Sequence, residues 1–217
     1  MQHGTVVDAV RIPDGDDVLN GDLQVPAGAS GLVIFAHGSG SSRFSTRNRR
    51  VAEFLNRGQL ATLLLDLLTP AEERVDVRTS EYRFDIPLLG RRVVAATDWA
   101  ASHPAVRELP IGYFGASTGA AAALIAAAER PTAGAVVSRG GRPDLAGGAL
   151  ARVRTPTLLI VGGNDEPVIE LNQIAMRQMS GEVELAIVPH ATHLFEEPGT
   201  LEEAQRLALD WFTRFIN

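Results

Sequence analysis

Short apolar runs rich in Val, Ile and Leu alternate along the chain with longer stretches of helical periodicity. This alternation predicts an α/β fold, in which a mostly parallel sheet is covered by helices on both faces. The apolar runs have the length and composition of strands that are buried on both faces of a sheet. We expect such strands at Leu32–Ala36, Ala61–Asp66, Ile111–Phe114, Ala135–Val137, Thr157–Val161 and Val183–Val188.

Two further apolar runs, Val6–Ile12 and Val18–Val25, flank a turn-forming segment of Pro, Asp and Gly residues. They predict an antiparallel hairpin ahead of the parallel strands, so the expected sheet has about eight strands.

The stretches of helical period predict helices between the strands. They lie at about Thr46–Arg57, Phe84–Ser102, Thr118–Glu129, Val168–Met179 and Leu201–Phe215. The segment from Arg74 to Asp85 carries charges of mixed sign and is interpreted as a loop beside the cleft. No internal repeat or long linker interrupts the pattern, and Arg139–Thr155 is too short for a lid. We therefore interpret residues 1–217 as a single domain without a cap domain.

Composition narrows the function classes. With 45% hydrophobic and 21% charged residues, the chain has globular composition. It holds no cysteine, which excludes disulfides, thiolate nucleophiles and cysteine zinc sites. All 20 of its basic residues are arginine, which excludes a Schiff-base lysine and a P-loop lysine.

Charge and hydropathy bear on partners and compartment. The net charge of −6 opposes nucleic-acid binding, which depends on clustered positive charge. No apolar run approaches the ~20 residues that cross a bilayer, and the first residues lack the pattern of a signal peptide. We therefore expect a cytoplasmic protein with neither a nucleic-acid partner nor a membrane partner. Its oligomeric state is not indicated by the sequence.

A G-x-S-x-G motif lies at Gly115–Gly119, directly after a predicted strand and directly before an Ala-rich helix. In that context it predicts a sharp strand-to-helix turn that exposes the hydroxyl of Ser117 as a nucleophile. The backbone N–H of Thr118, at the helix N-terminus, is one expected donor to a developing oxyanion. The alternative is a glycine-flanked turn that only packs the helix against the sheet.

A nucleophilic serine needs a histidine base, and the chain has five histidines. His3 lies in the N-terminal tail, and His103 follows the long helix. His37 opens a Gly- and Ser-rich loop after a strand, where the second oxyanion donor is expected; we assign that donor to the backbone N–H of Ser39 and give His37 a structural role. His193, in the loop after the last strand, is the preferred base, with His190 as the alternative.

The third group should be an acid that follows a strand between the serine and the histidine. The run Val161–Pro167 meets this description, with an apolar strand, two glycines and then carboxylates. Asp165 is the preferred acid and Glu166 the reserve. The alternative role for Asp165 is an ordinary helix N-cap. The chain order Ser117, Asp165, His193 matches the order in which such a triad occurs on this fold.

These motifs resemble the α/β-hydrolase superfamily and, within it, the compact dienelactone-hydrolase-like group. The resemblance spans nearly the whole chain. It rests on His37–Ser42, Asp66–Pro70, Gly115–Gly119, Asp165 and Ala191–His193. Dienelactone hydrolases proper use a cysteine nucleophile, whereas this chain has Ser117. The resemblance implies a capless hydrolase that acts on modest-sized or exposed esters, with no metal or organic cofactor.

Arg139 follows a predicted strand whose carboxyl end should lie beside the nucleophile, where open α/β sheets bind their ligands. Two roles are open for it: contact with a substrate carboxylate, or a structural pair with an acidic residue such as Asp144.

A basic cluster lies near the second oxyanion donor and consists of Arg43, Arg47, Arg49 and Arg50. We interpret it as the solvated start of a helix, with attraction of acidic substrates as the alternative.

The leading hypothesis is a serine hydrolase that cleaves a small-molecule carboxylic ester through an acyl-enzyme. A thioesterase, lactonase or amidase would use the same groups. A second class is a non-catalytic protein that keeps the fold to bind a small molecule. A third is a nucleotide-binding domain with a phosphate loop at Gly38–Arg43, but the third glycine of the dinucleotide fingerprint is Arg43 here.

Overall fold

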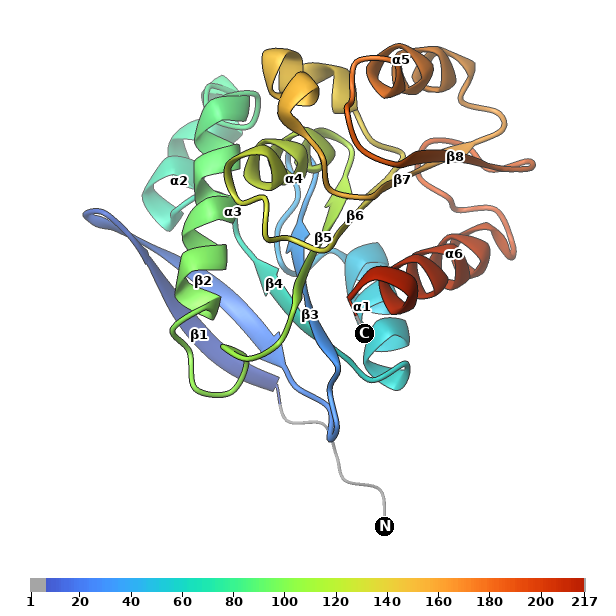
Figure 1. Ribbon diagram of the computed structural model, residues 1–217. Helices are drawn as coiled ribbons and strands as arrows, with labels where there is room; N and C mark the ends of the chain where they lie inside the picture. The colour runs from blue at the N-terminus through green and yellow to red at the C-terminus, as the bar shows by residue number, and fades with distance from the viewer. Residues whose placement is uncertain (1–6, 217) are drawn as a thin grey trace.

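The computed structural model describes residues 7–216 and contains one eight-stranded sheet in the order β1-β2-β4-β3-β5-β6-β7-β8 (Figure 1). The strands are β1 (Val7–Asp14), β2 (Asp17–Gln24), β3 (Gly31–Ala36), β4 (Leu60–Leu65), β5 (Ile111–Ala116), β6 (Ala135–Arg139), β7 (Thr157–Gly162) and β8 (Val183–Val188). β1 and β2 pair antiparallel as the predicted hairpin, and β3 to β8 are parallel to one another. The predicted fold class is therefore confirmed. Val6, the predicted first residue of the hairpin, lies outside the described residues.

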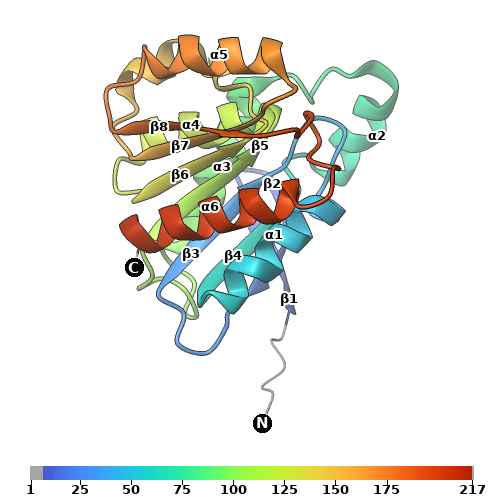
Figure 2. The ribbon, with the colours of Figure 1, turned by 90° about the vertical axis from the view of Figure 1, so that its right-hand side faces the viewer.

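Helices cover both faces of the sheet (Figures 1 and 2). They are α1 (Thr46–Arg57), α2 (Pro70–Thr79), α3 (Ile86–Ala100), α4 (Thr118–Glu129), α5 (Glu166–Met176) and α6 (Thr200–Phe215), with a 3₁₀ segment η1 (Pro143–Arg152). Helices α1 and α6 pack one buried apolar cluster against the sheet, and α3 and α4 pack the other. Helix α6 is amphipathic and buries Trp211 and Phe212 on the side that faces the sheet.

The interpretation of Arg74–Asp85 as a loop is wrong for its first half, which belongs to helix α2. Thr69 caps this helix: its hydroxyl accepts from the Glu72 amide, and the Glu72 carboxylate accepts from the Thr69 amide at 2.7 Å. Pro70 occupies the first turn. This capping box followed by proline is a sequence signal for a helix start, and it outweighs the alternating charges.

The helix predicted at Phe84–Ser102 is shorter at both ends, spanning Ile86–Ala100. The helix predicted at Val168–Met179 begins two residues earlier, at Glu166, and ends three residues earlier, at Met176. Within residues 7–216, no helix combines the length and the apolar character that crossing a bilayer requires.

The sheet positions the functional residues through the close contact between β5 and α4. A Cβ on Gly115 would lie 2.7 Å from the backbone nitrogen of Ala120, and a Cβ on Gly119 would lie 2.5 Å from the carbonyl oxygen of His37. Real Cβ atoms do not approach backbone atoms this closely. Only glycine at these two positions lets the helix start directly against the strand ends.

Gly115→Ala should therefore lower the free energy of unfolding by about 1–3 kcal/mol, because the backbone of α4 has to move to admit the methyl group. Equilibrium urea unfolding checks this value. Gly148→Ala is the matched control, since a Cβ there meets nothing within 4 Å and its φ is not positive. Equal stability of the two variants would contradict the packing argument.

Candidate active site

The predicted site residues gather at one edge of the sheet, because five neighbouring parallel strands end there. β3, β5, β6, β7 and β8 are adjacent in the sheet. They lead, in that order, to His37, Ser117, Arg139, Asp165 and His193. Segments up to 156 positions apart in sequence (193 minus 37) thus meet at the carboxyl ends of the strands.

Ser117 occupies the sharp turn between β5 and α4 with φ 51° and ψ −123°. A residue with a Cβ is strained in this region of backbone space, at a cost of about 1–3 kcal/mol. The surroundings hold the turn in place: the amide of Ser117 bonds the carbonyl of Arg139, and its carbonyl accepts from the amides of Ala120 and Arg142 at 3.1 and 3.0 Å. These hydrogen bonds hold the strained turn in place, and the turn sets Ser117 on the lining of a pocket.

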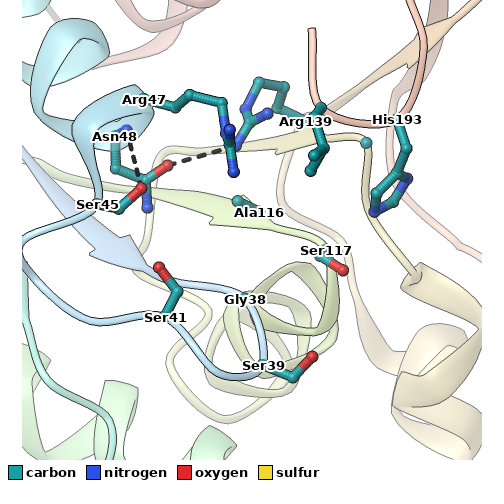
Figure 3. A pocket seen from close by; sticks show the side chains of 12 residues that line it. Gly38, Ser39, Ser41, Ser45, Arg47, Asn48, Ala116, Ser117, Arg139 and His193 are labelled. Carbon is teal, nitrogen blue, oxygen red and sulfur yellow. Dashed lines mark hydrogen bonds between the residues drawn. The ribbon is translucent and has the colours of Figure 1, made fainter. Parts of the chain in front are cut away.

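His193 and Asp165 are in direct contact: Nδ1 of His193 lies 2.7 Å from Oδ2 of Asp165. Asp165 occupies the N-cap position of α5, yet its side chain makes no capping bond. Its carboxylate is directed to the histidine instead. The two loops are also joined by their backbones, because the amide of Asn164 bonds the carbonyl of Ala191 at 2.9 Å. Figure 3 shows the imidazole of His193 turned toward the side of the pocket that holds Ser117.

The two alternative residues point elsewhere. His190 is exposed, and its carbonyl accepts from the side-chain amide of Asn164 at 3.0 Å. Glu166 is exposed in the first turn of α5. Neither side chain lines the pocket with Ser117.

The loop after β3 lies against the nucleophile. A Cβ on Gly38 would lie 3.1 Å from the Cβ of Ser117, so a larger residue would crowd the serine. The backbone N–H groups of Ser39 and Thr118 make no hydrogen bond to any other described residue. Both amides are therefore free to donate a hydrogen bond, which is the condition that the two predicted oxyanion donors must meet.

His37 stabilises this loop from within. The amide of Leu67 donates to its Nε2 at 3.0 Å, so Nδ1 carries the proton and donates to the carbonyl of Gly38 at 2.8 Å. The ring is buried, and burial lowers the pKa of His37 below its ordinary value of 6.5. The histidine is thus neutral near pH 7 and holds the loop to the end of β4.

The basic cluster is more than the solvated start of a helix. Arg43 pairs with both Asp66 and Asp22, and Arg49 pairs with Asp22 at 3.1 Å. The two aspartates are mostly buried, with exposed side-chain fractions of 17% and 14%. The interpretation as a solvated run is therefore wrong for Arg43, which anchors the loop to β2 and to the end of β4. It holds for Arg50, whose pair with Glu202 is exposed.

A cavity of about 260 Å³ opens beside Ser117 (Figure 3). Its lining includes Ser39, Ser41, Ser45, Arg47, Asn48, Ser117, Arg139 and His193. Most of these side chains are hydrogen-bond donors. No group of three or more His, Cys, Asp or Glu residues that could hold a metal ion occurs between residues 7 and 216.

Arg139 is buried in the wall of this cavity, with 5% of its surface exposed. The structural pair with Asp144 is wrong, because Asp144 binds Arg142 through two hydrogen bonds of 2.8 and 2.9 Å. Arg139 has only a long contact of 3.5 Å to Oδ1 of Asn48 and the ring of Phe195 at 5.5 Å. Burial lowers the pKa of Arg139 to about 10, with a smaller contribution from the positive charge of Arg47. It remains a cation at pH 7, without a carboxylate partner among the described residues.

Two contributions were missed by sequence reasoning. Glu197 holds the histidine loop: its carboxylate accepts from the amide and the hydroxyl of Thr192 at 3.0 and 2.6 Å. Asn48 faces the cavity from the first turn of α1. Neither has a local signal, because a glutamate after a turn and an asparagine in a helix are common on surfaces.

Comparison with known proteins identifies the family of the chain. The model of the dienelactone hydrolase family matches residues 50–217. The chain belongs to the dienelactone hydrolase family. A solved structure of dienelactone hydrolase from Anabaena variabilis ATCC 29413 is 56% identical, with a TM-score of 0.97, covering 99% of this chain and 100% of that one. This family membership supports hydrolase activity.

Two further relatives define the limits of the family comparison. A Mycobacterium tuberculosis protein named "putative phosphoribosyl transferase" is 57% identical over 94% of this chain, but the match spans only 45% of that protein. Est1E from Butyrivibrio proteoclasticus shares 19% identity with a TM-score of 0.75, covering 94% of this chain and 99% of that one. At that identity, Est1E shows the shared α/β-hydrolase fold alone.

The buried His37 predicts a pH-dependent loss of stability. Its folded-state pKa is lowered, so the unfolded chain binds more protons between the folded pKa and 6.5. The stabilisation is present above pH 6.5 and is lost as the pH falls toward the folded pKa. Urea unfolding at pH 7.5 and pH 5.5 should show a larger drop in unfolding free energy for the wild type than for His37→Gln. Identical drops would mean that His37 is not held neutral.

Proposed function

We propose that this protein is a serine hydrolase that cleaves carboxylic esters through an acyl-enzyme intermediate. The observation that carries the proposal is the 2.7 Å contact between Nδ1 of His193 and Asp165, with Ser117 and His193 lining one cavity. A carboxylate on Nδ1 fixes the tautomer whose Nε2 can accept a proton. Ser117 is held in a strained backbone conformation, and strain of this kind occurs mostly at functional sites.

In the proposed reaction, His193 takes the proton of Ser117 as the serine oxygen attacks the ester carbonyl carbon. Asp165 stabilises the imidazolium that forms. The tetrahedral oxyanion accepts hydrogen bonds from the amides of Ser39 and Thr118. The carbon–oxygen bond to the alcohol then breaks, and His193 gives its proton to the departing oxygen. Water, deprotonated by His193, attacks the acyl-enzyme, and the acid leaves as Ser117 regains its proton.

The electrostatics of the turn favour this assignment. Thr118 is the first residue of α4, so its amide has no partner within the helix and the positive end of the helix dipole faces the same point. A negative charge that develops on a substrate oxygen next to Ser117 is stabilised there without reorganisation of the protein. This arrangement suits acyl transfer, and we assign hydrolysis instead of the phosphoribosyl transfer named for the longer relatives.

Thioesters, lactones and amides would meet the same groups, so the identity of the bond is the finer part of the proposal. The cavity of about 260 Å³ favours a small substrate, or the exposed end of a larger one. The competing proposal is a non-catalytic binding protein. It gives no reason for the His193 and Asp165 contact beside a strained serine.

Ser117 should react with a fluorophosphonate, because an activated serine oxygen attacks phosphorus as it attacks a carbonyl carbon. Intact-mass spectrometry of the wild type should show one adduct, and Ser117→Ala should show none and lose p-nitrophenyl acetate turnover. Ser41→Ala is the control serine in the same cavity and should keep the adduct. A folded wild type with neither adduct nor turnover would favour the binding protein.

Asp165→Asn should lower kcat/KM for p-nitrophenyl acetate by about 10³–10⁴-fold, since the amide no longer holds the required tautomer of His193. Glu166→Gln is the matched control, because its side chain is next in sequence but exposed. We expect it to change kcat/KM by less than about twofold, as for most surface substitutions. A larger loss in Glu166→Gln than in Asp165→Asn would reassign the acid.

A further inference from the structure

The cavity beside Ser117 has a positive charge that the proposed mechanism does not use. Arg139 is buried and lacks a carboxylate partner, and its Nε has no hydrogen-bond partner among the described residues. Arg47 lies close enough to lower the pKa of Arg139. Among residues 7–216, the one carboxylate on Arg47 is that of Glu196 at 3.3 Å, which is 65% exposed and therefore screened by water. Figure 3 shows both guanidinium groups beside Asn48 on the same wall of the cavity.

An arginine that is buried to this extent normally forms ion pairs with carboxylates. Arg92, the other deeply buried arginine, is 2% exposed and contacts three carboxylates, Asp14, Asp17 and Glu72, at 2.7 to 2.8 Å. A cation left unpaired in the interior costs several kcal/mol. Arg139 therefore lowers the stability of the unliganded protein, and a bound anion would recover that free energy.

The N-terminus of helix α1 faces the same cavity. The helix has 12 residues and no acidic residue in its first turn. Ser45 caps it by accepting from the amide of Asn48, whereas the amides of Thr46 and Arg47 make no hydrogen bond to any other described residue. Free amides and the positive end of a helix dipole form a ready site for an anion.

We propose that this part of the cavity binds a phosphate group, and that the substrate is an ester that carries a phosphate on a part of the molecule away from the scissile bond. The proposal rests on the function proposed above. The phosphate would lie between the N-terminus of α1, with the Ser45 hydroxyl, and the guanidinium groups of Arg139 and Arg47. The ester carbonyl would then lie at Ser117 in the same cavity.

The donor set favours a phosphate over a carboxylate. A phosphate monoester carries close to two negative charges at neutral pH and has three terminal oxygens. It therefore accepts more hydrogen bonds than a carboxylate, which has one charge and two oxygens. Two guanidinium groups, the hydroxyls of Ser41 and Ser45 and the free amides of α1 supply that number. Two adjacent cations also repel each other less when a dianion lies between them.

Calorimetric titration with inorganic phosphate tests the proposal without catalysis. The wild type and Ser117→Ala should bind phosphate equally, and acetate should bind at least about tenfold more weakly. Arg139→Met should weaken phosphate binding by at least about 30-fold, in line with the loss of charge-assisted hydrogen bonds. Arg47→Gln should weaken it by about tenfold, because Arg47 is more exposed. Arg50→Gln, on the same helix but paired with Glu202, is the control and should bind like the wild type.

Arg139→Met should also unfold at a higher temperature than the wild type without phosphate, since it removes an unpaired buried charge. Should that variant fail to fold, Arg47→Gln decides the question. Absence of phosphate binding to the folded wild type, or unchanged binding in both arginine variants, would overturn the proposal. Acetate binding as tight as phosphate would overturn the phosphate assignment in favour of a carboxylate. Ser117→Ala keeps the phosphate subsite but loses the nucleophile. Phosphate binding therefore tests the subsite alone, and fluorophosphonate labelling of the wild type tests the proposed hydrolase function alone.

Discussion

The close approach of strand β5 to helix α4 is the constraint on which the site depends. Gly115 and Gly119 remove the two side chains that would push the helix away, one from the backbone at Ala120 and the other from the carbonyl of His37. The helix can then begin with only Ser117 between it and the end of the strand. As a result Ser117 takes a strained conformation, the amide of Thr118 is free, and the loop after β3 comes within contact of the serine.

The remaining parts of the site are held by networks that lie around this turn. The loop that carries Ser39 is fixed by the neutral His37 and by the pairing of Arg43 with Asp66 and Asp22. The loop that carries His193 is fixed by Glu197 through Thr192. Buried charges compensate one another in the first of these networks. Arg139 differs from these residues, because it is buried without a carboxylate partner among the described residues. An unpaired buried charge lowers stability, and this is expected at the wall of a cavity where a charged ligand binds.

Much of the fold and the choice of site residues was predictable because the relevant signals are local. Periodicity gave the eight-stranded sheet, and Thr46–Arg57 and Thr118–Glu129 begin and end as predicted. The G-x-S-x-G motif predicted the sharp turn at Ser117, because its two glycines permit close contact between backbone segments that are near in sequence. Helix α2 was missed because its alternating charges were given more weight than its capping box. The pairing of Asp165 with His193 was predicted from chain order as the preferred one, but the sequence left Glu166 and His190 open as alternatives.

The sequence by itself therefore determined the fold class, the strained turn and the candidate residues, because side-chain periodicity and glycine placement act over a few residues. Only the tertiary structure decided which acid meets which base. It placed Asp165 against His193 and directed Glu166 to solvent. It also paired Asp144 with Arg142 and left Arg139, beside the N-terminus of α1, without a carboxylate partner in the part of the chain that the structure describes. Ion pairing depends on distances of a few ångströms between segments far apart in sequence, and those distances are fixed by the packing of the whole sheet.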